Sequence, residues 1–170
     1  IVADSRGDYD EAERLCNESL AFLREIGDRQ GEAASLGNLG TIADSRGDYD
    51  EAKRLYNESL AIMREIGDRK GEANSLNNLG LIASDRGDLD KAERLYNESL
   101  AIDREIGNRK GEAGSLNNLG NIARNRGDYD EAERLHNESL AIKREIGNRE
   151  GEAGSLNNLG NIARNRGDYD

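Results

Sequence analysis

The chain repeats itself with a period of 40 residues. Residues 71–110 match residues 111–150 at 31 of 40 positions, and residues 151–170 are identical to residues 111–130. A fixed period of roughly 20–50 residues is typical of solenoids and propellers, in which each unit packs only on its neighbours. We therefore predict a single array over residues 1–170. It begins with a partial unit, Ile1–Asp10, expected to hold the end of a helix and a turn, and continues with four units over residues 11–50, 51–90, 91–130 and 131–170.

Within a unit, apolar and small residues recur every three or four positions, which is the period of an α-helix and not of a strand. In residues 31–70 a first stripe is formed by Ala33, Leu36, Leu39 and Ala43, and a second by Ala52, Leu55, Tyr56, Leu60, Ile62 and Ile66. Between the stripes, Gly47 is a typical left-handed helix stop and Asp48 a typical N-cap. Each unit is therefore predicted to hold a first helix, about residues 29–46, and a second helix from residue 49 to about residue 66.

Composition alone favours a disordered chain, because strongly apolar residues are few and the net charge is −11. Neither helix of a unit buries its stripe alone, but stacked helix pairs do, so the repeat outweighs this signal. One glycine lies inside each first helix, at Gly40, Gly80, Gly120 and Gly160. Since a glycine there costs about 1 kcal/mol relative to alanine, we expect each one to allow the close approach of a neighbouring helix.

Several classes of function are disfavoured by the sequence. No apolar run approaches the ~18 residues that span a membrane, and no targeting segment opens the chain. The acidic balance disfavours nucleic acid as a partner. One cysteine forms no intrachain disulfide, which suits the cytoplasm. A single histidine and the lack of a phosphate-binding loop leave little material for a metal site, a cofactor or an enzyme.

A pattern of small and apolar residues spans both helices of a unit: Leu76, Leu79, Gly80, Ala83, Gly87, Asp88, Ala92, Tyr96, Ser99 and Leu100. This pattern resembles the tetratricopeptide repeat (TPR) family. The unit is longer than the family's usual ~34 residues and has no proline after the second helix, a form similar to the repeats of kinesin light chains and of the Leu-Gly-Asn adaptors. The resemblance implies an all-α, right-handed α-solenoid, a superhelix of antiparallel helix pairs. It also implies that the first helices line a concave groove that binds peptides or protein segments without catalysis.

The first helix of each unit has a second, polar face opposite its apolar stripe. Four of the nine differences between residues 71–110 and 111–150 fall on this face. Tuning to a partner and drift of an exposed surface would both give that pattern. The candidate peptide-binding residues on this face are Asn77, Asn78, Asn117, Asn118, Asn121, Arg124, Asn125, Asn157, Asn158, Asn161, Arg164 and Asn165.

The chemistry of this face suggests its partner. An asparagine amide both donates and accepts hydrogen bonds, so it can satisfy the backbone of an extended peptide. Arg124 and Arg164 would favour acidic residues nearby. The leading hypothesis is therefore a module that binds an extended peptide or protein segment. The alternative is a structural scaffold or idealised array that associates end to end and has no dedicated ligand.

Self-association is expected from the ends of the array, where the last first-helix stripe lacks a partner. There is an obstacle: Ile1–Asp10 has the same repeat phase as residues 161–170, so the two segments would compete for one place. Two columns of the second helix complete the predictions. Cys16 and His136 share a column with tyrosines and are interpreted as packing residues. Asp103 and Lys143 occupy a column with Leu23 and Met63, and we expect these two charged side chains to stay out of the core.

Overall fold

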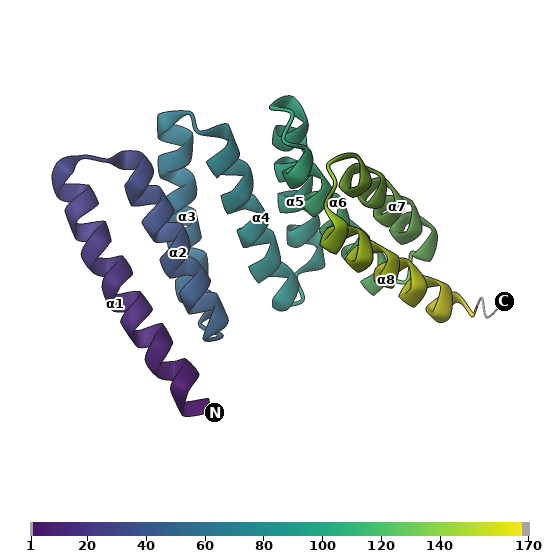
Figure 1. The fold of residues 1–170 in the computed structure, drawn as a ribbon, viewed down its shortest axis with the longest axis horizontal. Helices are drawn as coiled ribbons and strands as arrows, with labels where there is room; N and C mark the ends of the chain where they lie inside the picture. Colours follow the sequence, from purple (N-terminus) through teal and green to yellow (C-terminus); the bar gives the residue numbers. More distant parts are fainter. Residues whose placement is uncertain (1, 168–170) are drawn as a thin grey trace. The chain divides into compact units, whose positions relative to one another are not determined.

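The computed structural model describes residues 2–167, and this part of the chain is all-α, with eight helices and no strand (Figure 1). The helices are α1 (Val2–Ile26), α2 (Arg29–Ser45), α3 (Tyr49–Ile66), α4 (Arg69–Asp85), α5 (Leu89–Glu105), α6 (Arg109–Asn125), α7 (Tyr129–Glu145) and α8 (Arg149–Arg166). The first helices of the predicted units are α2, α4, α6 and α8. The second helices are α3, α5 and α7, together with most of α1.

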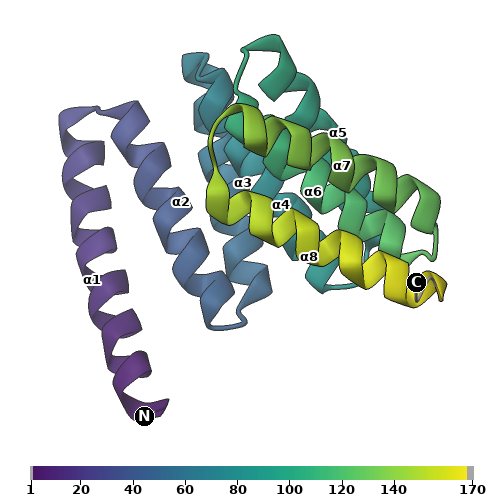
Figure 2. The same ribbon diagram turned by 45° about the vertical axis from the view of Figure 1, so that its right-hand side comes forward.

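The chain divides into two compact halves, residues 1–82 and residues 83–170, each larger than one 40-residue repeat unit. In the first, α2 packs between α1 and α3. In the second, α6 packs between α5 and α7, and α7 also packs on α8. Successive helices within each half run antiparallel, as Figure 1 shows for α1–α3. Figure 2 shows α7 and α8 side by side. In each half the core therefore lies where the first helix of a repeat unit meets the second helices on both sides of it.

Local chemistry at the turns accounts for the helix boundaries. Gly47 adopts φ 80°, a conformation that glycine enters without strain. The side chain of Asp48 then accepts a hydrogen bond from the backbone N–H of Glu51 at 3.2 Å, which caps α3. Asn108 caps α6 in the same way by accepting from Gly111 N–H at 3.3 Å. The stop-and-cap interpretation of these turns is confirmed.

The start of the chain differs from the prediction. Ile1–Asp10 was expected to hold a helix end and a turn at Gly7, but α1 continues through this segment from Val2 to Ile26. Gly7 is helical, and it is not among the glycines with positive φ. At Gly47 the turn brings α2 back against α3, whereas the described part of the chain holds no first helix ahead of Gly7 for a turn to pack against α1. Continuing the helix adds one hydrogen bond per residue, so the helix propagates instead.

The glycine inside the first helix does permit close packing. A Cβ atom placed on Gly40 would lie 2.7 Å from Cε1 of Tyr56, and one placed on Gly120 would lie 2.8 Å from Nε2 of His136. Both aromatic rings come from the second helix that follows. The expected compensation for these glycines is therefore confirmed at both positions.

The prediction for Asp103 was wrong, because this side chain is only 2% exposed. Its Oδ1 accepts a hydrogen bond from Nδ2 of Asn108 at 2.7 Å, and a Cβ on Gly111 would clash with the same oxygen. The glycine thus leaves room for the carboxylate, and the capping asparagine satisfies it. Lys143, in the same column, is half-buried and donates to Oγ of Ser155 at 2.8 Å, and burial lowers the pKa of this lysine.

Candidate peptide-binding surface

The residues predicted to bind a peptide all retain exposed surface. Asn77 and Asn78 lie on α4 within residues 1–82. The other ten lie on α6 and α8, within residues 83–170: Asn117, Asn118, Asn121, Arg124, Asn125, Asn157, Asn158, Asn161, Arg164 and Asn165. The part of the predicted surface that the structure brings together is therefore the face of α6 and α8, which we call the asparagine face.

One hydrogen bond joins the two helices of the asparagine face. Nδ2 of Asn158 on α8 donates to Oδ1 of Asn117 on α6 at 3.1 Å. The two residues are 41 positions apart, so the bond links equivalent faces of successive first helices. The amides of neighbouring units thus lie within reach of one another, as a continuous polar surface requires.

Helical periodicity sets this face apart from the core. On α6, Leu116 and Leu119 are buried, whereas Asn117 and Asn121 keep part of their surface exposed. A spacing of four residues places Asn117, Asn121 and Asn125 on one side of the helix. Packing of the apolar stripe therefore fixes the direction in which the asparagines point.

On α2, the residue equivalent to Asn121 contacts the second helix that follows. In residues 1–82, the hydroxyl of Tyr56 lies 3.1 Å from Oγ1 of Thr41, which occupies the position equivalent to Asn121. Burial raises the pKa of Tyr56. Thr41 on the polar face of α2 and Tyr56 in the core column are therefore in direct contact in this part of the chain.

His136 occupies the column of Tyr56 but makes no such bond. Its ring is fully buried, and neither Nδ1 nor Nε2 has a hydrogen-bond partner among the described residues. Burial is the main reason that the pKa of His136 is lowered to about 4, and the positive charges of Arg124 and Lys143 contribute to the same shift. A neutral, buried imidazole is a packing group, in agreement with the interpretation of this column.

Cys16 is the exception in the same column, because its side chain is only partly buried whereas Tyr56, Tyr96 and His136 are buried. The difference follows from position. Tyr56 lies against Gly40 of the first helix that precedes α3, and in the described chain no first helix precedes α1.

A buried glutamate in the first turn of each first helix was not recognised in the sequence. Glu32 accepts a hydrogen bond from Nε of Arg24 at 2.8 Å and another from Arg29 at 2.5 Å. The bond from Arg24 is the main reason that the pKa of Glu32 is lowered. The same arrangement recurs at Glu72 and Glu112. The available signal was that this glutamate and both arginines recur in every unit.

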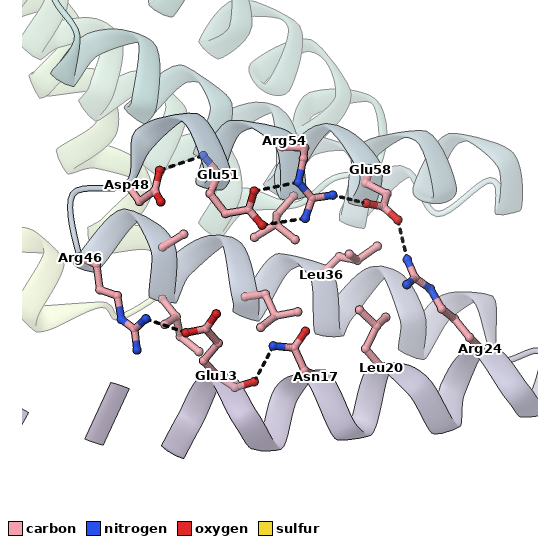
Figure 3. A pocket seen from close by; sticks show the side chains of 14 residues that line it. Glu13, Asn17, Leu20, Arg24, Leu36, Arg46, Asp48, Glu51, Arg54 and Glu58 are labelled. Atoms are coloured by element: carbon pink, nitrogen blue, oxygen red, sulfur yellow. Dashed lines mark hydrogen bonds and ion pairs between the residues drawn. The ribbon is translucent and has the colours of Figure 1, made fainter. Parts of the chain in front are cut away.

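A pocket of about 260 Å³ lies between α1, α2 and α3 (Figure 3). Its floor is apolar, with Leu20 and Leu36, and charged side chains surround it. These charges are paired with one another: Arg24 with Glu58 at 2.6 Å, and Arg54 with Glu58 at 3.1 Å. An equivalent pocket of about 260 Å³, with every lining residue shifted by 80 positions, lies between α5, α6 and α7. Because its charges are already satisfied, the pocket is a recurring feature of the helix packing and offers a ligand no unpaired group.

Two further searches concern the described residues alone. In residues 2–167 no helix combines the length and apolarity needed to cross a membrane. In the same residues no cluster of three or more histidine, cysteine, aspartate or glutamate side chains is placed to hold a metal ion.

Comparison with known proteins identifies the repeat. The profile of the tetratricopeptide repeat matches residues 3–65, 45–105 and 111–170. No curated protein matches the sequence. Among solved structures, the chain is similar to BtubC (BKLC) from P. vanneervenii, with 26% identity and a TM-score of 0.85, covering 98% of this chain and 69% of that one.

Two other solved structures share the fold at lower identity. A putative kinesin light chain from P. anserina, with nearly identical TPR-like repeats, is 18% identical with a TM-score of 0.73, covering 97% of this chain and 82% of that one. The apo form of RapI is 18% identical with a TM-score of 0.83, covering 96% of this chain and 46% of that one. These likenesses and the repeating helix pairs confirm an all-α solenoid. The chain belongs to the tetratricopeptide repeat family.

Proposed function

We propose that the asparagine face of α6 and α8 binds an extended peptide segment of a partner protein. TPR repeats generally mediate protein–protein interaction. The observation that carries the finer proposal is the hydrogen bond from Asn158 to Asn117, at 3.1 Å between the two helices. It supports a surface on which amides from successive units are near enough to serve successive peptide groups, each donating and accepting.

The charge of the asparagine face supports an acidic peptide segment as its ligand. The chain carries a net charge of −11, yet residues 113–126 and 153–166 contain no aspartate or glutamate. Arg126 pairs with Asp90 and Glu93, whereas Arg124 and Arg164 form no ion pair within the described residues. Two guanidinium groups near the ends of α6 and α8 therefore remain available to carboxylates of a bound segment.

The proposal is tested by reversing these two charges. The probe is a set of fluorescent extended peptides with two acidic residues at varied spacing, measured beside the same peptides with Asn and Gln in place of Asp and Glu. Arg124→Glu with Arg164→Glu should weaken the acidic peptides at least tenfold while circular dichroism stays helical. A peptide set that binds the wild type and this double variant equally would contradict the proposal.

The chain itself provides a matched control. Lys70→Glu with Lys110→Glu makes the same change in net charge, and the equivalent position 150 already carries glutamate. This control should bind the acidic peptides as the wild type does, which separates the local effect of the arginines from overall charge. The proposed role involves no catalysis and no cofactor, and its proposed setting is the cytoplasm, where the single Cys16 stays reduced.

A second candidate function is end-to-end assembly of the chain into a scaffold. One observation favours it: a helix face that is buried on α6 is exposed on α8, although residues 111–126 and 151–166 are identical. The asparagine face and this apolar face lie on different sides of α8, so the two functions are compatible and can be tested separately.

A further inference from the structure

Two identical helices have different surroundings in this chain. Leu116 on α6 is 1% exposed, whereas its equivalent on α8, Leu156, is 50% exposed. Gly120 lies against the ring of His136, whereas no atom of another helix in the described chain lies within 4 Å of a Cβ placed on Gly160. The cover on α6 is α7. The surface complementary to the exposed face of α8 is therefore that of a helix like α7.

The chain holds a second helix with that sequence. Residues 9–26 of α1 are identical to residues 129–146 of α7 at 15 of 18 positions. On α7, Leu135 and Ser139 are buried against α6, but their equivalents on α1, Leu15 and Ser19, are exposed, Leu15 by 51%. The face of α1 that would cover α8 is therefore itself uncovered.

Two ion pairs hold α7 in place on α6, and the residues equivalent to their partners lie beside the exposed face of α8 and on α1. Arg104 pairs with Glu138 at 2.6 Å, and Arg109 pairs with Glu145 at 2.5 Å, so that two cations bind the helix that covers α6. The equivalent cations beside α8 are Arg144 and Arg149. The equivalent carboxylates on α1 are Glu18 and Glu25.

The present contacts of these groups leave them accessible. Arg149 is 87% exposed, compared with 39% for Arg109, and among the described residues Arg144 pairs with Glu152 alone, at 3.9 Å. Glu18 pairs with Arg14 of its own helix at 3.2 Å and remains exposed. The charges therefore match as well as the apolar surfaces: two cations on one face and two carboxylates on the other.

The path of α1 removes the obstacle anticipated from the sequence. Were Ile1–Asp10 to fold back as a partial first helix, it would occupy the place on α1 that α8 needs. In the structure α1 is one helix from Val2 to Ile26, so residues 2–10 extend along the axis of α1. The face with Leu15 stays uncovered without any rearrangement.

We infer that α1 of a second copy of this chain docks on α8 as α7 docks on α6. This inference rests on the second candidate function, assembly, and names its junction. Leu15 of the second copy covers the stripe around Leu156, and Glu18 and Glu25 pair with Arg144 and Arg149. The contact joins two different surfaces, so each copy in a pair still offers one of each, and the association continues to higher order unless a ring closes.

The test begins with single substitutions at exposed positions, which leave the fold of the monomer intact. Light scattering of the 170-residue chain should show a mass that rises with concentration above the 18.7 kDa of the monomer. Leu156→Lys and Leu15→Lys should each hold the mass at that of the monomer. Leu81→Lys, at a residue of α4 that is 42% exposed and outside the junction, is the control and should associate as the wild type does.

Mixing the two blocked variants distinguishes this junction from any symmetric contact. Leu156→Lys retains a competent α1, and Leu15→Lys retains a competent α8, so an equimolar mixture should form a one-to-one dimer and nothing larger. Circular dichroism of each variant checks that it is folded. Glu18→Arg with Glu25→Arg should raise the concentration for half-association at least fivefold.

Each contrary result has a distinct meaning. If the wild type associates but neither Leu156→Lys nor Leu15→Lys reduces the mass, assembly stands and this junction is wrong. If the mixture shows no dimer, the pairing of α1 with α8 is wrong. A wild type that remains a monomer at millimolar concentration contradicts both the junction and the assembly function, while peptide binding to the asparagine face is measured independently.

Discussion

His136 lies so close to Gly120 that a Cβ at that glycine would be 2.8 Å from Nε2 of the imidazole ring. The ring is fully buried, and both of its nitrogens lack a hydrogen-bond partner in the described structure. The contact joins the middle of α6 to the middle of α7, which makes it sensitive both to added volume and to added charge.

Acid should weaken this contact. The pKa of His136 is lowered from 6.5 to about 4 in the folded chain, so below pH 6.5 the unfolded chain takes up a proton that the folded chain does not. The free energy of unfolding therefore falls as the pH drops from 6.5 towards 4, by about 2–3 kcal/mol at pH 4.5. Urea unfolding at pH 7 and pH 4.5 measures this loss.

The control for acid sensitivity is His136→Tyr, which restores the residue found at Tyr56 and Tyr96. Carboxylates titrate alike in the two proteins, so the difference between them isolates the imidazole. The variant should lose less stability between pH 7 and pH 4.5 than the wild type does. Equal losses would mean that His136 is protonated without cost in the folded state.

Two glycines with identical sequence surroundings should respond oppositely to alanine. At Gly120 the new methyl group meets His136, and overpacking of this kind costs about 1–3 kcal/mol. At Gly160 nothing lies within 4 Å, so alanine gains up to about 1 kcal/mol of helix propensity. Thermal unfolding at low micromolar concentration, where junctions between copies do not form, should rank Gly160→Ala above the wild type and Gly120→Ala below it.

Removing the charge of a buried glutamate should destabilise the chain. Glu32 is held by Arg24 and Arg29, and its side chain is 8% exposed, so Glu32→Gln removes the charge that both arginines share and places an amide NH2 donor against one of them. We expect a loss of about 1–3 kcal/mol in urea unfolding. Glu11→Gln removes a carboxylate from an exposed pair with Arg14 and should change stability little, because exposed pairs are screened by water.

The pH dependence of this site has a defined sign. Because the pKa of Glu32 is lowered in the folded chain, mainly by the hydrogen bond from Arg24, its contribution to stability is present above the ordinary carboxyl pKa and is lost as the pH falls through the folded value. Glu32→Gln should therefore be less sensitive to acid than the wild type. If Glu32→Gln and the wild type lose the same free energy of unfolding at acid pH, the arginines do not stabilise the charged form of this carboxylate.

Cys16 should react readily with a thiol reagent in dilute folded protein. Its side chain is partly exposed, whereas the equivalent His136 is fully buried. The comparison protein carries Cys16→Ser with His136→Cys, which moves the only thiol to the buried position, and its labelling should be at least tenfold slower until denaturant is added. Similar rates in the two folded proteins would contradict the assignment of their surroundings.

Much of the fold follows from the repeat in the sequence. Helical spacing predicted the stripes of Leu36 and Leu39, and the Gly47–Asp48 pair predicted the turn between α2 and α3, because a left-handed glycine and a capping carboxylate act over a few residues. The close approach of a neighbouring helix was also predicted correctly at Gly40 and Gly120, but it was wrong at Gly160, where no neighbouring helix lies within 4 Å. These features depend on local chemistry, which a single sequence contains in full.

The features that could not be predicted from the sequence depend on contacts between neighbouring repeat units. Helix α1 is continuous through Gly7, and the described residues hold no first helix ahead of it, although the sequence motif at Gly7 is the same as at Gly47. Asp103 was expected outside the core, but Gly111 and Asn108 of the following turn provide the space and the hydrogen bond that bury it. On the asparagine face, helical period placed Asn117 and Asn158 on equivalent sides of their helices, and only the folded chain gives the hydrogen bond between them.

The identity of α6 and α8 has a consequence for how the chain folds. Helix α7 packs on both of them, through a different face of each, and the two helices have the same sequence along residues 111–126 and 151–166. Side chains therefore specify which kinds of helix are neighbours, but they do not record the position of a helix along the array. That information lies in the turns, which are short enough to favour the adjacent helix by effective concentration alone. Lengthening the turn at Gly147 would make the array ambiguous, with α7 free to exchange one identical partner for another.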